Sequence, residues 1–453
     1  MINLFKGDKD FYIKLVSLAL PIALQNFIMS ALNMVDTVMI GQLGEVEIAS
    51  VALANQIFFL LTLLLFGISS GASIFNAQFW GKKDIPNIRR ILGLSVLCSS
   101  SAAAVFTAAA FFTSRQLLAV FSTDTQVIGM GSSYMRIVCL SYIMTAVSFC
   151  YSSALRSTGN VKLPMLVSMF ALGINTFLNY LLIFGKFGFP MLGVEGAAIA
   201  TVIARLVEMT LILLAVYSKR LVPAASIKEL LDIKLGFIKM YFKTALPVIM
   251  NEVLWSTGVT LYSVAYARMG TGVIASINIS STVERISLVL FFGISSACAV
   301  MVGNKIGEGD ENTASLYARR LAVLGPALGI LFGTGVIISS GWILSIYNVS
   351  AAVYEDARRV LSIFGIVMAF KVFNVINVVG ILRGGGDTKF GLFIDTAGIW
   401  LISVPLAFLG GLVWSLPVYI VYALVNLEEV FKIIFGIRRL ASGKWVNNLV
   451  QNV

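Results

Sequence analysis

The chain has 453 residues, of which 58% are hydrophobic and only 12% charged, with a mean hydropathy of +0.92. A typical soluble domain has about 25% charged residues, so this composition excludes a soluble fold and indicates a protein that has the lipid bilayer as its solvent. The net charge of +11 does not indicate a nucleic-acid partner, because the positions of the basic residues, given below, account for it.

Apolar segments long enough to cross a bilayer follow one another along the whole chain. A spanning helix needs about 20 such residues. The first half has six segments, at residues 14–40, 48–80, 91–113, 127–155, 162–184 and 193–218. The second half has six more, at residues 240–267, 274–304, 318–346, 356–382, 389–411 and 416–438.

The most polar stretch of the chain separates these two sets of segments. It begins at Lys219 and is rich in lysine. We therefore predict an all-α membrane protein with twelve transmembrane helices, divided into an N-lobe (1–218), a cytoplasmic linker (219–239) and a C-lobe (240–453) around a central cavity.

Short motifs of the first half recur in the second half, in the same order and at a nearly constant offset. The recurring pairs are Ala19-Leu20-Pro21 with Ala245-Leu246-Pro247, Gly67-Ile68-Ser69-Ser70 with Gly293-Ile294-Ser295-Ser296, and Leu155-Arg156 with Leu382-Arg383. Each repeat holds an even number of spans, so both halves enter the membrane from the same side. Parallel repeats of this kind place a transport site between the halves and alternate access to it by rocking.

Most of the 33 basic residues fall in segments on one side of the predicted membrane. By the positive-inside rule this side is cytoplasmic, and it includes both termini. We expect a monomer in the cell membrane, in contact with lipid. There is no histidine, no cluster of metal ligands and no glycine-flanked serine with a base. We therefore predict neither an enzyme nor a resident cofactor.

Asp36 is the first candidate for ion coupling. It lies near the end of the first span, where an ionisable group costs roughly 2.5–3.5 kcal/mol on insertion scales and marks function by default. A buried carboxylate there can take up a proton or Na⁺ and release it inside. The alternative is a hydrated carboxylate at the outer interface.

Asn175 and Asn179 are spaced to share one face of the fifth span. Their amide oxygens suit a hard cation such as Na⁺, and the hydroxyl of Thr201 on the sixth span can complete its coordination shell. The alternative for the two asparagines is hydrogen bonding between helices, and that for Thr201 is packing.

The second half carries its intramembrane charges elsewhere. Glu252 is a candidate for a substrate or second cation site, or else pairs with a basic group on another helix. Glu284 and Arg285 are adjacent, which favours a charge pair between them or with neighbours. Lys371 and Asp395 are predicted to pair across helices, with a second substrate or cation role left open for Asp395.

Pro21 and Pro247 occupy equivalent positions in the two repeats. A proline within a helix removes a backbone hydrogen bond and favours a kink. We predict a kink at both, the alternative being prolines that merely begin a helix. Arg156 and Arg383 are predicted to anchor helix ends at lipid headgroups.

The sequence resembles the multidrug and toxic compound extrusion (MATE) family over nearly its whole length. The resemblance is carried by Leu20-Pro21 followed by Val35-Asp36-Thr37, by the run Gly193–Thr201, and by the loop that begins Leu155-Arg156. It implies an antiporter that exports organic, often cationic compounds in exchange for Na⁺ or H⁺. It also implies an N-lobe cation site at Asp36, Asn175, Asn179 and Thr201, and bending at Pro21 when occupancy of that site changes.

Two departures from the family and one rival function remain. Asn179 stands where some members have an aspartate, so Asp36 is the one clear carboxylate of the N-lobe site. The tenth span has Lys371 and Asn374 but no acid in its interior, which places a C-lobe cation site in doubt. The rival function is a lipid-linked oligosaccharide or lipid flippase, for which Arg205, Arg285 and Lys371 would supply positive charge.

Overall fold

The computed structural model describes residues 9–451, and within them every regular element is a helix. The outermost residues of the two predicted lobes, 1–8 and 452–453, lie outside the described part. The helices of the first half are α1 (Lys9–Gly41), α2 (Glu45–Gly81), α3 (Ile85–Phe112), α4 (Ser114–Ala119), α5 (Thr125–Val138), α6 (Ser141–Ser157), α7 (Lys162–Phe184) and α8 (Gly193–Ser218).

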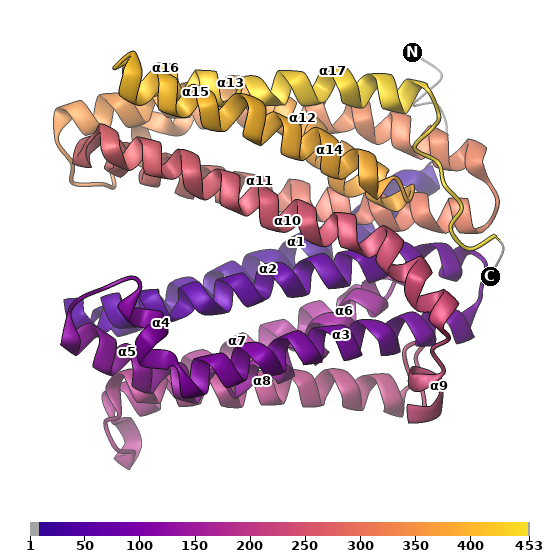
Figure 1. Cartoon of the computed structure of the whole chain (residues 1–453), viewed down its shortest axis with the longest axis horizontal. Helices are drawn as coiled ribbons and strands as arrows, with labels where there is room; N and C mark the ends of the chain where they lie inside the picture. Colours follow the sequence, from indigo (N-terminus) through magenta and orange to yellow (C-terminus); the bar gives the residue numbers. More distant parts are fainter. Residues whose placement is uncertain (1–8, 452–453) are drawn as a thin grey trace. The chain divides into compact units, whose positions relative to one another are not determined.

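The remaining helices follow a short helix, α9 (Ile227–Leu231), in the linker (Figure 1). They are α10 (Leu235–Met269), α11 (Thr271–Gly307), α12 (Glu311–Leu344), α13 (Ala351–Val375), α14 (Thr388–Gly398), α15 (Val404–Phe408), α16 (Val418–Val425) and α17 (Leu427–Ala441). The all-α membrane fold predicted from hydropathy is thus confirmed. Within residues 9–451, nine helices are long and apolar enough to cross a membrane, or ten if α5 and α6 form one bent span. The count of twelve stays a prediction.

Four of the predicted spans contain a break or a π-helical segment, and one of these is the tenth, which ends in a π-helix at Ile376–Leu382. The fourth breaks into α5 and α6 with a bend of 49°. At this break the Thr107 hydroxyl donates to the Cys139 carbonyl and the Ser141 hydroxyl to the Val138 carbonyl. Such side-chain bonds compete with the helical ladder and bend it. The eleventh contains two π-helical turns, at Ile399–Ser403 and Leu409–Val413. The last divides at Asn426, between α16 and α17.

The chain forms two compact units, and each unit includes a helix segment from the other half of the sequence. The N-unit is Leu24–Ile249, and the C-unit is Met250–Val453 together with Met1–Ala23. The boundaries lie just after Pro21 in α1 and Pro247 in α10. The first part of α1 therefore belongs with the C-unit, and the first part of α10 with the N-unit. The predicted lobe boundaries themselves stay a prediction.

The recurring Gly-Ile-Ser-Ser motif explains this exchange of first helices. In the C-unit, a Cβ at Gly293 would lie 2.7 Å from the Ala19 carbonyl oxygen of α1. In the N-unit, a Cβ at Gly67 would lie 2.9 Å from Cα of Ile249 in α10. Glycine lets two helix backbones approach this closely. The same motif therefore forms the contact surface for the borrowed helix in both units.

The linker between the predicted lobes is held to the N-unit by ion pairs. Ser226 and Glu229 form a capping box at the start of α9. Arg89 of α3 pairs with Glu229 at 2.5 Å, and Arg90 pairs with Asp232. The charged residues that identify this stretch as a linker in the sequence thus fix it to α3.

Replacement of Gly293 by alanine is expected to destabilise the protein, because the new methyl group overlaps the backbone of α1. Overpacking of this kind costs about 1–3 kcal/mol. Gly173→Ala is the matched control, since Gly173 is exposed on α7 with no atom within 4 Å of a Cβ and alanine favours a helix. Thermal unfolding in detergent should show a lower midpoint for Gly293→Ala alone. Equal midpoints for the two variants would contradict the packing argument.

Candidate functional site

The four residues predicted for the N-lobe site lie together in the N-unit. Asn179 of α7 donates through Nδ2 to Asp36 Oδ1 of α1 at 2.5 Å and to Asn175 Oδ1 at 3.1 Å. Asn175 Nδ2 in turn donates to Thr201 Oγ1 of α8 at 3.5 Å. Both asparagines are fully buried, and Asp36 is half-buried. The helical spacing of Asn175 and Asn179 is what directs both amides toward the same neighbours.

One oxygen of this site lacks a hydrogen-bond donor. Asn179 Oδ1 is buried without a partner among the described residues. A buried carbonyl oxygen left in this way costs free energy, which a hard cation, a proton-bearing group or an ordered water can offset. The donor set of one carboxylate, two amides and a hydroxyl fits Na⁺ by its oxygen chemistry. A proton needs only the carboxylate.

Two small cavities in the N-unit continue the site toward α6. One of about 10 Å³ is lined by Asn175, Thr201, Arg205 and Glu208. The next, of about 60 Å³, is lined by Arg205, Glu208 and Arg156 among other residues. A water needs a cavity of roughly 10–15 Å³ and two or more polar partners. These cavities therefore provide room for water between the Asp36 site and α6.

A polar network lines these cavities. Arg205 and Glu208 form an ion pair on α8 at 2.8 Å, and Ser168 donates to Glu208 at 3.0 Å. Gln25 links Ser168 to Arg156, with distances of 3.2 Å and 3.3 Å. Arg156 thus faces a cavity, and the prediction that it anchors a helix end at lipid headgroups is wrong.

In the C-unit, Glu252 forms a largely buried ion pair with Arg383. Its carboxylate meets the guanidinium of Arg383 at 2.6 Å, and the two side chains are only 13% and 6% exposed. The structure therefore places Arg383 inside the protein and not at a lipid headgroup. The open alternative for Glu252, a basic partner on another helix, is the arrangement observed. Asn251, its neighbour, donates to Asp395 at 3.0 Å.

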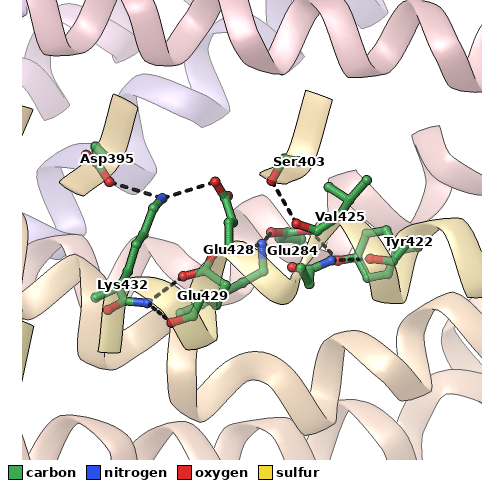
Figure 2. A network of polar contacts seen from close by, with 11 residues as sticks. Glu284, Asp395, Ser403, Tyr422, Val425, Glu428, Glu429 and Lys432 are labelled. Atoms are coloured by element: carbon green, nitrogen blue, oxygen red, sulfur yellow. Dashed lines mark hydrogen bonds and ion pairs between the residues drawn. The ribbon is translucent and has the colours of Figure 1, made fainter. Parts of the chain in front are cut away.

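The pair expected between Lys371 and Asp395 is wrong, whereas the expected pairing of Glu284 with a neighbouring charge is observed. Asp395 pairs with Lys432 of α17 at 3.0 Å and not with Lys371. Lys371 pairs with Glu284 of α11 at 2.8 Å. Arg285 is exposed and donates to a backbone carbonyl, so the adjacent Glu284 and Arg285 do not pair. Figure 2 shows the resulting network.

Four charged residues of these networks were absent from the sequence-based candidates. They are Glu208, Glu428, Glu429 and Lys432. Each lies inside a predicted span, so charge within an apolar segment was the available signal. Glu208 also follows Arg205 at the helical spacing of an ion pair.

Pro21 and Pro247 both lie within continuous helices, α1 and α10. They do not begin a helix, which removes that alternative. The kink predicted at each proline stays a prediction.

The long apolar helices, with ionisable groups paired among them, define a multi-pass membrane protein. A family model described as MatE matches residues 21–181 and 247–409, one match in each half. The chain belongs to the MatE family. The two matches begin at Pro21 and Pro247, in agreement with the internal repeat.

Curated relatives cover nearly the whole chain. A "Probable multidrug resistance protein NorM" of Thermotoga maritima is 25% identical, over 96% of this chain and 94% of its own length. The "Uncharacterized transporter YisQ" of Bacillus subtilis is 24% identical, over 97% and 96%.

Solved structures share the fold. A mutant of the Vibrio cholerae MATE transporter VcmN has a TM-score of 0.88 at 18% identity, covering 98% of this chain and 99% of that one. A transporter of the MOP superfamily from Pyrococcus furiosus has a TM-score of 0.83 at 18% identity, covering 98% of each chain. These matches are to multidrug resistance proteins and transporters, and they give no support to the flippase alternative.

Removal of Arg383 is expected to destabilise the protein strongly, because it leaves the Glu252 charge buried without its partner. Breaking a buried pair from one side costs about 3–5 kcal/mol, whereas replacing both partners with apolar residues is often neutral. Arg383→Leu should therefore lower the unfolding midpoint in detergent, and adding Glu252→Leu should restore most of it. A double variant no more stable than Arg383→Leu would show that the two charges are not coupled.

Proposed function

We propose that this protein is a secondary active antiporter that exports organic, often cationic compounds in exchange for inward Na⁺ or H⁺. It works by rocker-switch alternating access, as a monomer in the cell membrane with both termini in the cytoplasm. Membership of the MatE family and the names of its multidrug resistance relatives support a multidrug substrate range. The coupling ion and the substrate are part of the proposal.

The observation that carries this proposal is the hydrogen-bonded chain from Asp36 through Asn179 and Asn175 to Thr201. It joins the one carboxylate of the N-lobe candidates to buried amides, and it includes an oxygen without a donor. A group arranged in this way gains from an added cation. The adjoining cavities offer a route for a hydrated ion or a proton through ordered water.

The free energy of an ion gradient is large enough for a single coupling site to drive export. When a monovalent organic cation leaves in exchange for one entering monovalent ion, the electrical work cancels and the ion gradient alone drives transport. A tenfold ion gradient supplies about 1.4 kcal/mol, which sustains about a tenfold gradient of the substrate. For a neutral substrate, each 100 mV adds about 2.3 kcal/mol.

Asp36→Asn is expected to abolish coupled export, since it removes the charge that the ion must neutralise while preserving the shape of the side chain. In proteoliposomes with a tenfold concentration gradient of Na⁺ or of H⁺, the wild type should maintain about a tenfold concentration gradient of a fluorescent cationic dye. The variant should approach equal concentrations. Glu45→Gln is the control, because Glu45 is exposed at the start of α2.

The two gradients, imposed separately, identify the ion. Export driven by a Na⁺ gradient at equal pH assigns Na⁺, and export driven by a pH gradient without Na⁺ assigns H⁺. If Asp36→Asn maintains the wild-type dye gradient under both conditions, Asp36 is not the coupling carboxylate.

A further inference from the structure

An arginine without a counter-charge lines the larger of the two N-unit cavities. Arg156 lies in the last turn of α6 and is half-buried. Its guanidinium donates to Gln25 Oε1 of α1 at 3.3 Å, and none of the ion pairs among the described residues includes it. Because Gln25 is neutral, the positive charge of Arg156 and most of its N–H groups are left for another partner.

The other charged groups of this cavity neutralise each other. Arg205 and Glu208 also line it, and they form the ion pair at 2.8 Å described above. The second oxygen of the Glu208 carboxylate accepts from Ser168 at 3.0 Å, so both of its oxygens have donors. Two arginines and one glutamate therefore leave the cavity with one positive charge, and that charge is on Arg156.

Hydroxyl groups extend from Arg156 along the same face of α6. Ser152 and Ser148 line the cavity about one and two turns before Arg156, and both are buried. Residues four apart share one face of a helix. The Ser148 hydroxyl has no hydrogen-bond partner within the described part of the chain. This face of α6 thus carries one guanidinium and two hydroxyls, all of which can donate hydrogen bonds.

The counterpart of Arg156 in the second half has an anion within the chain. Arg383 corresponds to Arg156 in the internal repeat, and it pairs with Glu252 of α10 at 2.6 Å. The residue of the first half that corresponds to Glu252 is Asn26, which lines the same cavity as Arg156. The N-unit therefore has an amide where the C-unit has a carboxylate. An anion from outside the chain would take the part that Glu252 has in the C-unit.

The hydroxyl groups also distinguish the two halves. At the offset that relates the two arginines, Ser148 and Ser152 correspond to Val375 and Val379. A hydroxyl in an apolar segment costs free energy unless it finds a hydrogen-bond partner. The hydroxyls occur in the half whose arginine lacks an anion, which indicates that their partner is that same anion.

The charge and size of the cavity favour a carboxylate as this anion. One unpaired cation balances a monoanion, whereas a phosphate group carries up to about two negative charges. The planar guanidinium matches the two oxygens of a carboxylate with parallel N–H groups. The cavity, of about 60 Å³, has room for about four water molecules. A drug-sized ligand needs roughly 300–1,000 Å³, so the cavity can take the carboxylate end of such a compound and not the whole of it.

We propose that Arg156, Ser148 and Ser152 form an anion subsite in the N-unit, which binds the carboxylate of an exported compound. The substrates then include zwitterions, which carry a carboxylate together with a positive charge. Use of the subsite in export rests on the proposed antiport function, whereas carboxylate binding itself does not. No covalent bond forms or breaks, because the carboxylate exchanges hydrogen bonds with water for hydrogen bonds with the subsite.

Binding to the purified protein in a neutral detergent, without an ion gradient, tests the subsite. The probes are a rhodamine dye with a free carboxylate and the methyl ester of the same dye, so they differ at that group alone. By fluorescence anisotropy, Arg156→Gln should bind the carboxylate dye about tenfold more weakly or worse, and should bind the ester no more weakly than the wild type does. The double variant Ser148→Val with Ser152→Val should weaken binding of the carboxylate dye alone, by a smaller factor.

Two further variants serve as controls. Lys219→Gln removes a positive charge outside the cavity, because Lys219 is exposed just after α8, and it should leave the affinity of both dyes unchanged. Arg156→Lys keeps the charge without the planar fork and should retain part of the preference for the carboxylate dye. Arg156→Gln removes a charge that has no partner, so its unfolding midpoint should not fall below that of the wild type. Should it nevertheless not fold, the double serine variant is the deciding measurement.

Competition identifies the anion. Benzoate should displace the carboxylate dye and not the ester, and chloride at the same concentration should displace neither. Displacement by chloride to the same extent would assign the subsite to an inorganic anion and overturn the carboxylate assignment. Equal weakening of both dyes in Arg156→Gln would show that the arginine merely shapes the cavity, and it would overturn the proposal. So would unchanged binding of the carboxylate dye in that variant, or a wild type that binds the ester alone.

Transport in proteoliposomes separates this proposal from the coupling role of Asp36. Asp36→Asn should abolish export of both dyes and still bind the carboxylate dye, whereas Arg156→Gln should lose export of the carboxylate dye and keep that of the ester. If no gradient drives either dye, the antiport function is wrong, and carboxylate binding stands on the detergent measurement. Wild-type export of the carboxylate dye by Arg156→Gln, with binding weakened, would overturn the use of the subsite in transport.

Discussion

The high cost of an unpaired charge in an apolar interior governs the arrangement of this protein. An apolar interior does not solvate charge, so an ionisable side chain there must meet an opposite charge, a set of donors or a proton. Arg205 meets Glu208, and Arg383 meets Glu252. Asp36 differs from these pairs, because its carboxylate accepts from the amide of Asn179.

The two halves share their backbone design and differ in their charges. Both have a proline in the first helix and a Gly-Ile-Ser-Ser motif that accepts the first helix of the other half. The N-unit places one carboxylate among amides and small cavities. The C-unit has a dense network of lysines and acids instead. Duplication thus preserved helix packing, which tolerates few changes, while the polar interior diverged.

Hydropathy and repetition were enough to predict the helical membrane fold and the proximity of Asn175 and Asn179, because both follow from the helical period. Pairing in the C-unit was not predictable in the same way. Whether Lys371 reaches Asp395 or Glu284 depends on how neighbouring helices are rotated, and the sequence does not contain that information locally. Lys432 and Glu428 were missed because the apolar residues around them dominate their segment. The exchange of first helices was missed because chain order suggests that each half is self-contained.

That exchange makes the two halves of the chain depend on each other. An isolated half would leave the surface around its Gly-Ile-Ser-Ser motif uncovered, and the first part of its own first helix would have no place to pack. Two copies of such a half would cover each other by swapping that helix, which is a low-cost route to a dimer. In this chain each half supplies the segment that covers the motif of the other, so neither half carries a complete packing surface by itself.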